Sequence, residues 1–137
     1  MIKGMTLAGV RLMGRLPDPI ETYIDAYNRK DVEGMLMCLA GNVFFQNISG
    51  GEVTAEALDK QSFAQMARFG ASAFETRQQK VVNAITVAGT TLAEIDYTAV
   101  VATDLPNGWK AGQKLAFSGA SAFRVEDGKI ISIVDES

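Results

Sequence analysis

Apolar side chains recur at helical spacing where the patterned part of the chain begins. Ile20, Tyr23 and Tyr27 fall on one side of a helix that this spacing predicts over residues 17–29. Asp18 stands between two prolines, and we expect it to cap the first turn of this helix. The predicted helix therefore presents an apolar stripe that carries two phenolic hydroxyl groups.

Two more helical patterns follow the first. We expect Asp31 to cap a short second helix that continues until Gly41. Thr54 is expected to cap a third helix over residues 55–69. The side chains that share one face of this third helix are Leu58, Ser62, Met66 and Phe69. The first half of the chain is thus predicted to supply three helices.

Segments of strand character occupy the rest of the chain. Residues 42–48 are rich in β-forming side chains and end at a serine followed by two glycines, which predicts a strand and a turn. Four later segments also have strand character: residues 73–87, 91–103, 113–125 and 129–135. Because the helices come first and most strands afterwards, this order predicts an α+β domain with antiparallel neighbouring strands.

The composition is typical of one globular domain. The chain has 137 residues, of which 47% are hydrophobic, and its formal net charge is -3 without a stripe of lysine and arginine. No apolar run approaches the roughly 20 residues of a membrane span. We expect residues 1–16 to form an extension rather than a targeting signal. The composition therefore predicts a cytoplasmic domain over residues 17–137, with neither nucleic acid nor a membrane as partner.

Histidine is absent from the sequence, and Cys38 is its single cysteine. The commonest metal ligand and the commonest general base are therefore missing, which excludes histidine-based zinc sites and histidine-activated nucleophiles within this chain. Cys38 stands among methionine and leucine residues, which indicates a buried, unreactive thiol. We predict neither a metal site nor a cofactor.

Four segments together resemble a known family. Residues 19–35, 47–51, 105–108 and 127–130 are similar, in order and spacing, to SnoaL-like proteins of the nuclear transport factor 2-like superfamily. The resemblance implies a cone-like fold in which three N-terminal helices pack on a strongly curved antiparallel or mixed sheet and enclose a pocket. It also implies a small hydrophobic ligand and frequent dimerisation through the outer surface of the sheet. Because this fold hosts isomerases, cyclases, hydrolases and binding domains, the resemblance leaves the activity open.

Alternation along the last strands predicts which side chains face the pocket. Large side chains at odd positions of residues 115–123 are expected to point inward, whereas small ones at even positions form a flat outer face. We expect the same outer face to include, from the preceding strand, Ala93, Ile95, Tyr97, Ala99 and Val101. This flat apolar surface predicts a homodimer.

Comparison with ketosteroid isomerases suggests the roles of three pocket residues. The resemblance places Tyr23, Asn47 and Ser121 where those enzymes carry a tyrosine and two acidic residues. An amide cannot accept and return a proton near neutral pH, so Asn47 is expected to orient a ligand but not to act as a base. Isomerisation by the steroid-isomerase mechanism is therefore disfavoured.

Limonene epoxide hydrolases offer a second comparison. Asp96 and Asp135 resemble their acidic pair, whereas Glu94 stands in place of their arginine. The strand register predicted from the sequence puts both aspartates on the inner face, on the order of 10 Å apart. Burial would raise the pKa of either carboxyl group into a useful range. The alternatives are a hydrogen-bonded structural role for Asp96 and a solvated strand end for Asp135.

Two functions remain open at this point. In the first, Asp96, Asp135 and Tyr23 are the catalytic groups of a cofactor-independent cyclase, isomerase or hydrolase. In the second, the domain binds a ligand or dimerises without catalysis. The side chains expected to contact the ligand in either case are Tyr27, Phe45, Asn47, Phe63, Met66, Trp109, Phe117 and Ser121. Arg77 resembles a recurrent family arginine, and we expect it to pair with Glu75 at the surface.

Overall fold

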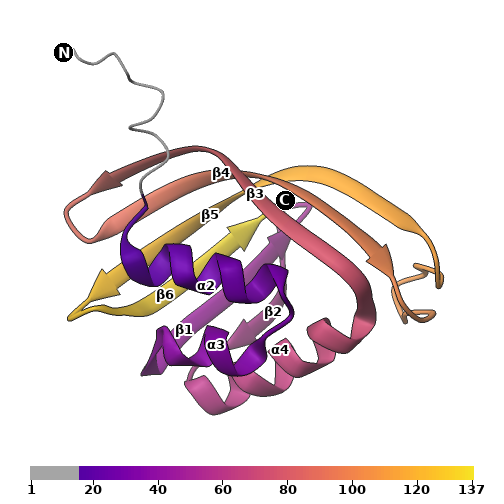
Figure 1. Cartoon of the computed structure of the whole chain (residues 1–137), viewed down its shortest axis with the longest axis horizontal. Coiled ribbons are helices and arrows are strands. Elements are labelled where there is room, and N and C mark those ends of the chain that lie inside the picture. The colour runs from indigo at the N-terminus through magenta and orange to yellow at the C-terminus, as the bar shows by residue number, and fades with distance from the viewer. Residues whose placement is uncertain (1–15) are drawn as a thin grey trace.

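The computed structural model describes residues 16–137, in which three helices cover one side of a six-stranded sheet (Figure 1). The predicted extension at residues 1–16 lies almost wholly outside the described part. The helices are α2 (Asp18–Asn28), α3 (Val32–Met37) and α4 (Lys60–Ala73). The strands are β1 (Leu39–Ser49), β2 (Glu52–Ala57), β3 (Phe74–Val87), β4 (Thr90–Val101), β5 (Lys114–Glu126) and β6 (Lys129–Glu136).

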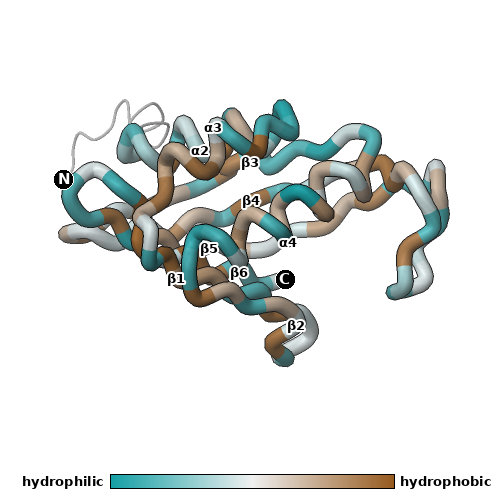
Figure 2. Tube along the Cα trace, turned by 90° about the horizontal axis from the view of Figure 1, so that it is seen from below, coloured by the Kyte–Doolittle hydropathy of each residue, from teal (hydrophilic) through white to brown (hydrophobic). Residues whose placement is uncertain are grey.

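The sheet is mixed, with the strand order β2-β1-β6-β5-β4-β3. Only the pair of β1 and β6 is parallel, and the other neighbours are antiparallel. The long strands bend around the helices, and the connection between β4 and β5 projects at one end of the molecule (Figures 1 and 2). This arrangement confirms the predicted α+β cone with a curved sheet. No helix within residues 16–137 is both long and apolar enough to cross a membrane.

The starts of the first two helices follow different rules. Asp31 caps α3 as predicted, because its Oδ1 accepts a hydrogen bond of 3.0 Å from the backbone N–H of Gly34. The predicted cap at Asp18 is wrong. Pro17 occupies the cap position of α2, and its carbonyl accepts from the N–H groups of the first turn. Asp18 lies inside that turn, where its negative charge interacts favourably with the helix dipole.

A second strand, β2, precedes α4 where the sequence pattern predicted helix. The chain reverses at Gly50 and Gly51, whose positive φ angles of 60° and 83° suit a tight turn, and residues 52–57 then pair with β1. Thr54 therefore lies in β2, and the predicted cap at Thr54 is wrong. Asp59 caps α4 instead, since its Oδ1 accepts from the N–H of Ser62 at 2.8 Å.

The buried face of α4 also differs from the predicted one. It is formed by Phe63, Ala64, Ala67 and Ala73, and Met66 packs partly against the core. Leu58 and Phe69, which were expected on the inner face, are 68% and 60% exposed. Because the helix begins at residue 60 rather than 55, the apolar stripe that meets the sheet is centred on Phe63.

The core lies between the helices and the inner face of β1, β6, β5 and β4. Its largest fully buried side chains include Phe123, Ile20, Met35, Leu39, Ile130 and Ile133. Tyr23 joins α2 to this core, with its ring 6.4 Å from Phe63 and 6.2 Å from Phe123 between centroids. Cys38 is 7% exposed and donates to the carbonyl of Gly34, as expected for a structural thiol.

The predicted inner face of β5 is confirmed, but that of β4 is inverted. Ser121 and Phe123 are buried on β5, and Ser121 pairs with the buried Ala93 on β4. On β4, Ile95 is also buried, so its odd positions point inward and its even positions point outward. A slip of one residue in the predicted register turns every side chain of a strand to the other face. The outer face therefore does not contain the β4 residues expected there.

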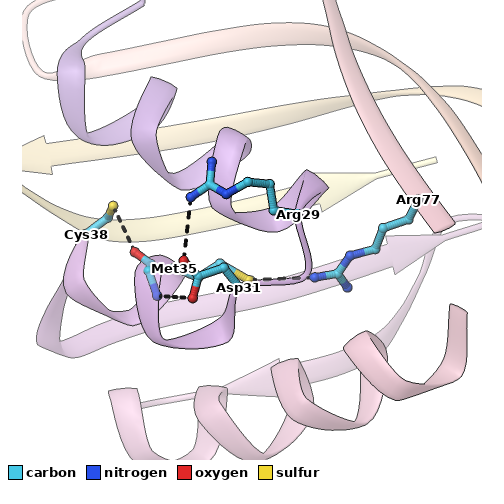
Figure 3. A network of polar contacts seen from close by, with 6 residues as sticks. Arg29, Asp31, Met35, Cys38 and Arg77 are labelled. Atoms are coloured by element: carbon cyan, nitrogen blue, oxygen red, sulfur yellow. Dashed lines mark hydrogen bonds and ion pairs between the residues drawn. The ribbon is translucent and has the colours of Figure 1, made fainter. Parts of the chain in front are cut away.

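Arg77 is buried rather than paired with Glu75 at the surface. From β3 it reaches across to Met35 of α3 (Figure 3), with Nη2 3.8 Å from Sδ. Its Nε donates to the carbonyl of Tyr27 at 2.9 Å, and its Cζ lies 3.7 Å from the centroid of the Tyr27 ring. Arg77 thus fixes the last turn of α2 against β3, which the surface interpretation did not anticipate.

Two phenylalanines test the observed packing. We expect Phe123→Ala to lower the free energy of unfolding by about 3–5 kcal/mol, because a fully buried ring is lost. The matched change Phe69→Ala removes an exposed ring and should change it by no more than about 0.5 kcal/mol. Urea unfolding followed by circular dichroism measures both. Equal losses in the two variants would contradict the assignment of the buried face.

Candidate functional site

An open cavity of about 570 Å³ lies at the inner face of the sheet. Its walls come from the end of α2, from β1 and β3–β6, and from the loop between β4 and β5. The polar and aromatic side chains that line it are Tyr27, Asn47, Ser49, Phe74, Gln79, Tyr97, Trp109, Phe117, Ser118, Ser121, Asp135, Glu136 and Ser137. Such a volume suits a small organic molecule.

The predicted ligand contacts divide into two groups. Those that line the cavity are Tyr27, Asn47, Trp109, Phe117 and Ser121. The other three, Phe45, Phe63 and Met66, lie outside its lining and belong to the core or its edge. The rings of Phe45 and Phe63 stack edge to face with centroids 5.3 Å apart. These three side chains therefore belong to the packing of the core and not to the cavity wall.

Asp96 does not reach the cavity. It is an even-numbered residue of β4, is exposed on the outer face, and accepts a hydrogen bond of 3.0 Å from the Ser118 hydroxyl. Glu94 is exposed on the same strand, again at an even position. The prediction that Asp96 and Asp135 share the inner face is wrong for the reason given above, a one-residue slip along β4.

Asp135 is the carboxylate that the cavity does contain. It lies near the end of β6, directly between Ser121 of β5 and Asn47 of β1 in the strand register. The Ser121 hydroxyl donates to its Oδ1 at 2.6 Å. Burial raises the pKa of Asp135 to about 6, and the Ser121 hydrogen bond offsets part of that rise. Asp135 can therefore exchange a proton close to neutral pH.

Tyr23 stands behind Asp135 as a neutral phenol. The side chain is 3% exposed and does not line the cavity. Burial raises the pKa of Tyr23 well above its ordinary value, and the nearby negative charge of Asp135 raises it further. Because its pKa is raised, Tyr23 stays protonated and can donate a hydrogen bond.

Asn47 is held by polar neighbours at the edge of the pocket. Its Nδ2 donates to Thr54 Oγ1 at 2.8 Å and to Ser49 Oγ at 3.3 Å. The amide nitrogen is therefore occupied by β2 and by the end of β1. The cavity contact of Asn47 is consistent with the expected role of orienting a ligand.

Aromatic rings form the opposite end of the cavity. The ring of Tyr97 lies 5.1 Å from Phe117 and 6.4 Å from Phe74, and Trp109 lies 6.4 Å from Phe74. The Tyr27 hydroxyl donates to the Tyr97 hydroxyl at 3.1 Å. Burial raises the pKa of Tyr97, so its phenol stays protonated. Trp109 lines the cavity, in agreement with its prediction as a ligand contact.

The lining residues that were not predicted from the sequence include Phe74, Gln79 and Tyr97. Tyr97 was expected on the outer face, and the correct register of β4 would have found it. Phe74 and Gln79 lie on β3, whose inward positions follow only from its pairing with β4, for example Gln79 with Tyr97. The signal for them was therefore tertiary rather than local.

Position 119, on β5 between the two ends of the cavity, requires a glycine. A Cβ atom on Gly119 would lie 2.6 Å from the carbonyl oxygen of Glu136 and 3.2 Å from the Cβ of Ser137. The end of β6 thus passes directly over β5 at this point. The close approach brings the segment after Asp135 into the lining of the cavity.

Several solved structures are similar to this chain in fold, and they are described as different kinds of protein. A candidate polyketide cyclase from Xanthomonas campestris pv. campestris has a TM-score of 0.74 and 21% identity, with 88% of this chain and 87% of that chain covered. An M. tuberculosis LEH-like epoxide hydrolase has a TM-score of 0.71 and 15% identity, covering 88% and 80%. A Catenulispora acidiphila protein with a ketosteroid isomerase-like fold, in complex with trimethylamine, has a TM-score of 0.71 and 12% identity, covering 88% and 85%.

At these identities the likeness establishes the fold and not the activity. No curated protein is a detectable sequence relative of the chain. The family comparison is more specific, because the model described as a SnoaL-like domain matches residues 20–133. That match includes the helices, the aromatic end of the cavity and Ser121, and it confirms the resemblance drawn from the sequence motifs. The chain therefore belongs to the SnoaL-like domain family.

Proposed function

We propose that the protein is a cofactor-independent enzyme that moves protons on a small, mostly apolar molecule, as a cyclase or an isomerase does. The observation that carries this proposal is Asp135, a partly buried carboxyl group with a pKa of about 6 in a pocket that five aromatic side chains also line. A base is most effective when its pKa lies near the working pH. Asp135 meets this condition, and Ser121 holds its carboxylate in place.

The proposed step is proton removal from a carbon next to a carbonyl group. Asp135 takes the proton, and the electron pair of the C–H bond forms an enolate. In an isomerase the proton returns from Asp135 to another carbon. In a cyclase the enolate carbon attacks a second carbonyl within the same molecule, and the proton goes to the resulting alkoxide. Asn47 is proposed to orient the molecule, and the Tyr97 phenol to donate to one of its oxygen atoms, whereas Tyr23 does not line the cavity and makes no contact with the molecule.

Epoxide hydrolysis has weaker support. The resemblance to epoxide hydrolases relied on Asp96 and Asp135 acting together across one water molecule. Asp96 is exposed on the outer face, with Glu94 on the same face. Asp135 is thus left without the second buried carboxylate that the paired mechanism requires.

Ligand binding without catalysis is the second candidate function. It is favoured by Asn47 and Ser121, because an amide and a hydroxyl stand where the related isomerases carry acids. In that case the same cavity holds a small hydrophobic molecule, and Asp135 serves only as a hydrogen-bond acceptor. The two functions differ in whether replacing Asp135 abolishes a proton transfer.

We also propose a homodimer that forms through the outer surface of the sheet. Ile85 and Leu92 are 60% and 55% exposed and lie opposite each other on β3 and β4, and Ala122 lies beside Leu92 on β5. This row is apolar across three strands. A second copy of the row would remove it from water.

The first test is base catalysis on a planar aromatic probe, 5-nitrobenzisoxazole. Its C–H bond breaks as a base removes the proton, its N–O bond opens, and the nitrophenolate product is coloured. We expect the wild-type protein to accelerate this elimination, with a rate that rises as the pH passes about 6 and Asp135 ionises. Asp135→Asn should lower the rate about 100-fold or more, because the base is lost.

The matched control for this assay is Asp96→Asn, which removes an exposed carboxylate from β4 of the same sheet. Its rate should stay within about twofold of the wild type. If Asp135→Asn retains the wild-type rate, or if wild type shows no acceleration over free acetate, the catalytic proposal fails and ligand binding becomes the better account.

The raised pKa of Asp135 also predicts how stability depends on pH. The pKa of this carboxyl group is 3.8 in the unfolded chain and about 6 in the folded protein. Between these values the folded state holds the extra proton, so the free energy of unfolding falls as pH rises through this range and then levels off. Asp135→Asn should therefore be more stable than wild type by about 3 kcal/mol near neutral pH, and equal to it below pH ~3.5.

Urea unfolding at several pH values measures this difference. Asp96→Asn serves again as the control, and its unfolding should follow the wild-type profile. A variant Asp135→Asn that is less stable than the wild type at neutral pH would show that the ionised carboxylate stabilises the fold, contrary to the proposal.

The dimer is tested by sedimentation velocity. We expect Leu92→Lys to dissociate it, because a charged side chain then stands in the apolar row. The matched change Leu58→Lys alters a leucine that is also exposed but lies before α4, and it should leave the dimer intact. A wild-type protein that sediments as a monomer at about 50 μM, where interfaces of standard size are populated, contradicts the proposal.

A further inference from the structure

The neighbours of Asn47 allow its side-chain amide only one orientation. The Thr54 hydroxyl donates its single proton to the backbone carbonyl of Asn47 at 3.3 Å, so Thr54 Oγ1 can only accept from the amide. The atom of Asn47 that lies 2.8 Å from Thr54 Oγ1 is therefore Nδ2, and Nδ2 also donates to Ser49 Oγ at 3.3 Å. Both amide protons are thus used, and Oδ1 is the polar atom that Asn47 can offer to the cavity it lines.

Asp135 offers a second acceptor at the same end of the cavity. The Ser121 hydroxyl donates to its Oδ1 at 2.6 Å. Oδ2 makes no hydrogen bond to residues 16–137, and it is not enclosed either, because Gln79 Oε1 is the only buried side-chain nitrogen or oxygen of that range without a partner. A molecule in the cavity can therefore reach Oδ2 of Asp135.

The two acceptors stand side by side on neighbouring strands. Asn47 of β1 pairs with Asp135 of β6 in parallel register, and both side chains line the cavity. Neighbouring strands lie about 4.8 Å apart, so one small group can contact both residues. The donors beside them are already engaged, since the Ser121 hydroxyl bonds to Asp135 and the Asn47 amide bonds to β2 and Ser49. The pair therefore lacks a donor that a bound molecule can supply.

The charged groups around this pair are negative. The cavity lining within residues 16–137 includes Asp135 and the exposed Glu136 beside it, but neither lysine nor arginine. Tyr23 of α2 stands behind Asp135 as a neutral phenol, while Ser121 of β5 and Asn47 of β1 carry no charge. An anion or a lone pair would be repelled at this end, whereas a cation would be attracted.

The rest of the cavity suits an apolar body. Tyr97 pairs with Phe117 of β5, whereas Asp135 pairs with Ser121, four residues further along the same strand. Four residues of a strand span roughly 13 Å. A molecule that reaches from the acceptor pair to the aromatic end is therefore extended, and ring faces favour a flat one.

We propose that Asn47 and Asp135 bind a protonated amine carried by a flat, apolar ligand. One N–H of the ammonium group donates to Oδ1 of Asn47 and another to Oδ2 of Asp135, and its positive charge pairs with the carboxylate. A ketone or an ether presents only lone pairs to the same oxygens. The inference rests on the proposed function, because the same cavity is assumed to hold the ligand, and it adds the charge and the donor group of that ligand.

Two probes of similar size separate a donor from an acceptor. 2-(Aminomethyl)naphthalene is a cation at neutral pH and can only donate, whereas 2-acetylnaphthalene is neutral and can only accept. In isothermal titration calorimetry at about pH 8, we expect wild type to bind the amine about tenfold more tightly than the ketone. At about pH 5 this preference should be lost, because Asp135, with a pKa of about 6, is then mostly protonated.

Four variants identify the groups that bind the amine. Asp135→Asn should abolish both the preference at about pH 8 and its pH dependence, because the charge is gone. Asn47→Leu removes one acceptor and should lower the preference about fivefold, whereas Asn47→Asp adds a charge and should raise it. If Asn47 served only to hold β2, both of its variants would lower the preference. Asp96→Asn, on the outer face, is the control and should match wild type.

The inference is overturned if wild type binds the ketone more tightly than the amine at about pH 8, or binds no amine at about 5 mM. An amine preference that persists in Asp135→Asn overturns it as well, because the cation then binds elsewhere. The elimination assay uses a neutral probe and is independent of this one. A protein that binds the amine as described without accelerating the elimination refutes the catalytic proposal alone, and one that accelerates it but prefers the ketone refutes this inference alone.

Discussion

The pairing of β5 with β4 on one side and with β6 on the other is the constraint on which the pocket depends. It sets Ser121 opposite both Ala93 and Asp135, and the parallel pairing of β6 with β1 brings Asn47 to the same level. Because side chains alternate along each strand, these few pairs decide the direction of every other side chain in the sheet. Asp135 therefore points into the pocket, whereas Asp96 points to solvent.

The helices complete what the sheet begins. Tyr23 packs between Phe63 and Phe123, and burial of Asp135 beneath the helices is the physical origin of the raised pKa of that carboxyl group. At the other end, Arg77 and Tyr27 bind the end of α2 to β3. The same contacts that stabilise the fold thus create the electrostatic environment of the pocket.

Local patterns in the sequence predicted the helices at α2 and α3, five of the six strands and the α+β class, because capping residues, helical spacing and alternation are properties of short segments. They failed where the outcome depends on a distant partner. Residues 52–57 form a strand only because β1 offers an edge, and the direction of Asp96 depends on a register that the loop between β4 and β5 sets. The family motifs identified Asn47, Ser121 and Asp135 correctly as cavity residues, whereas Gln79 carries no motif at all.

Asp135 and Gln79 pose the same thermodynamic question at opposite ends of the cavity. A carboxyl group whose charged form is disfavoured and an amide oxygen without a donor both oppose folding, and neither packs the core. A domain selected for stability alone would replace them with apolar side chains of similar size, as it has done elsewhere along the inner face of β4. Both residues line the cavity in which we propose that a small molecule binds.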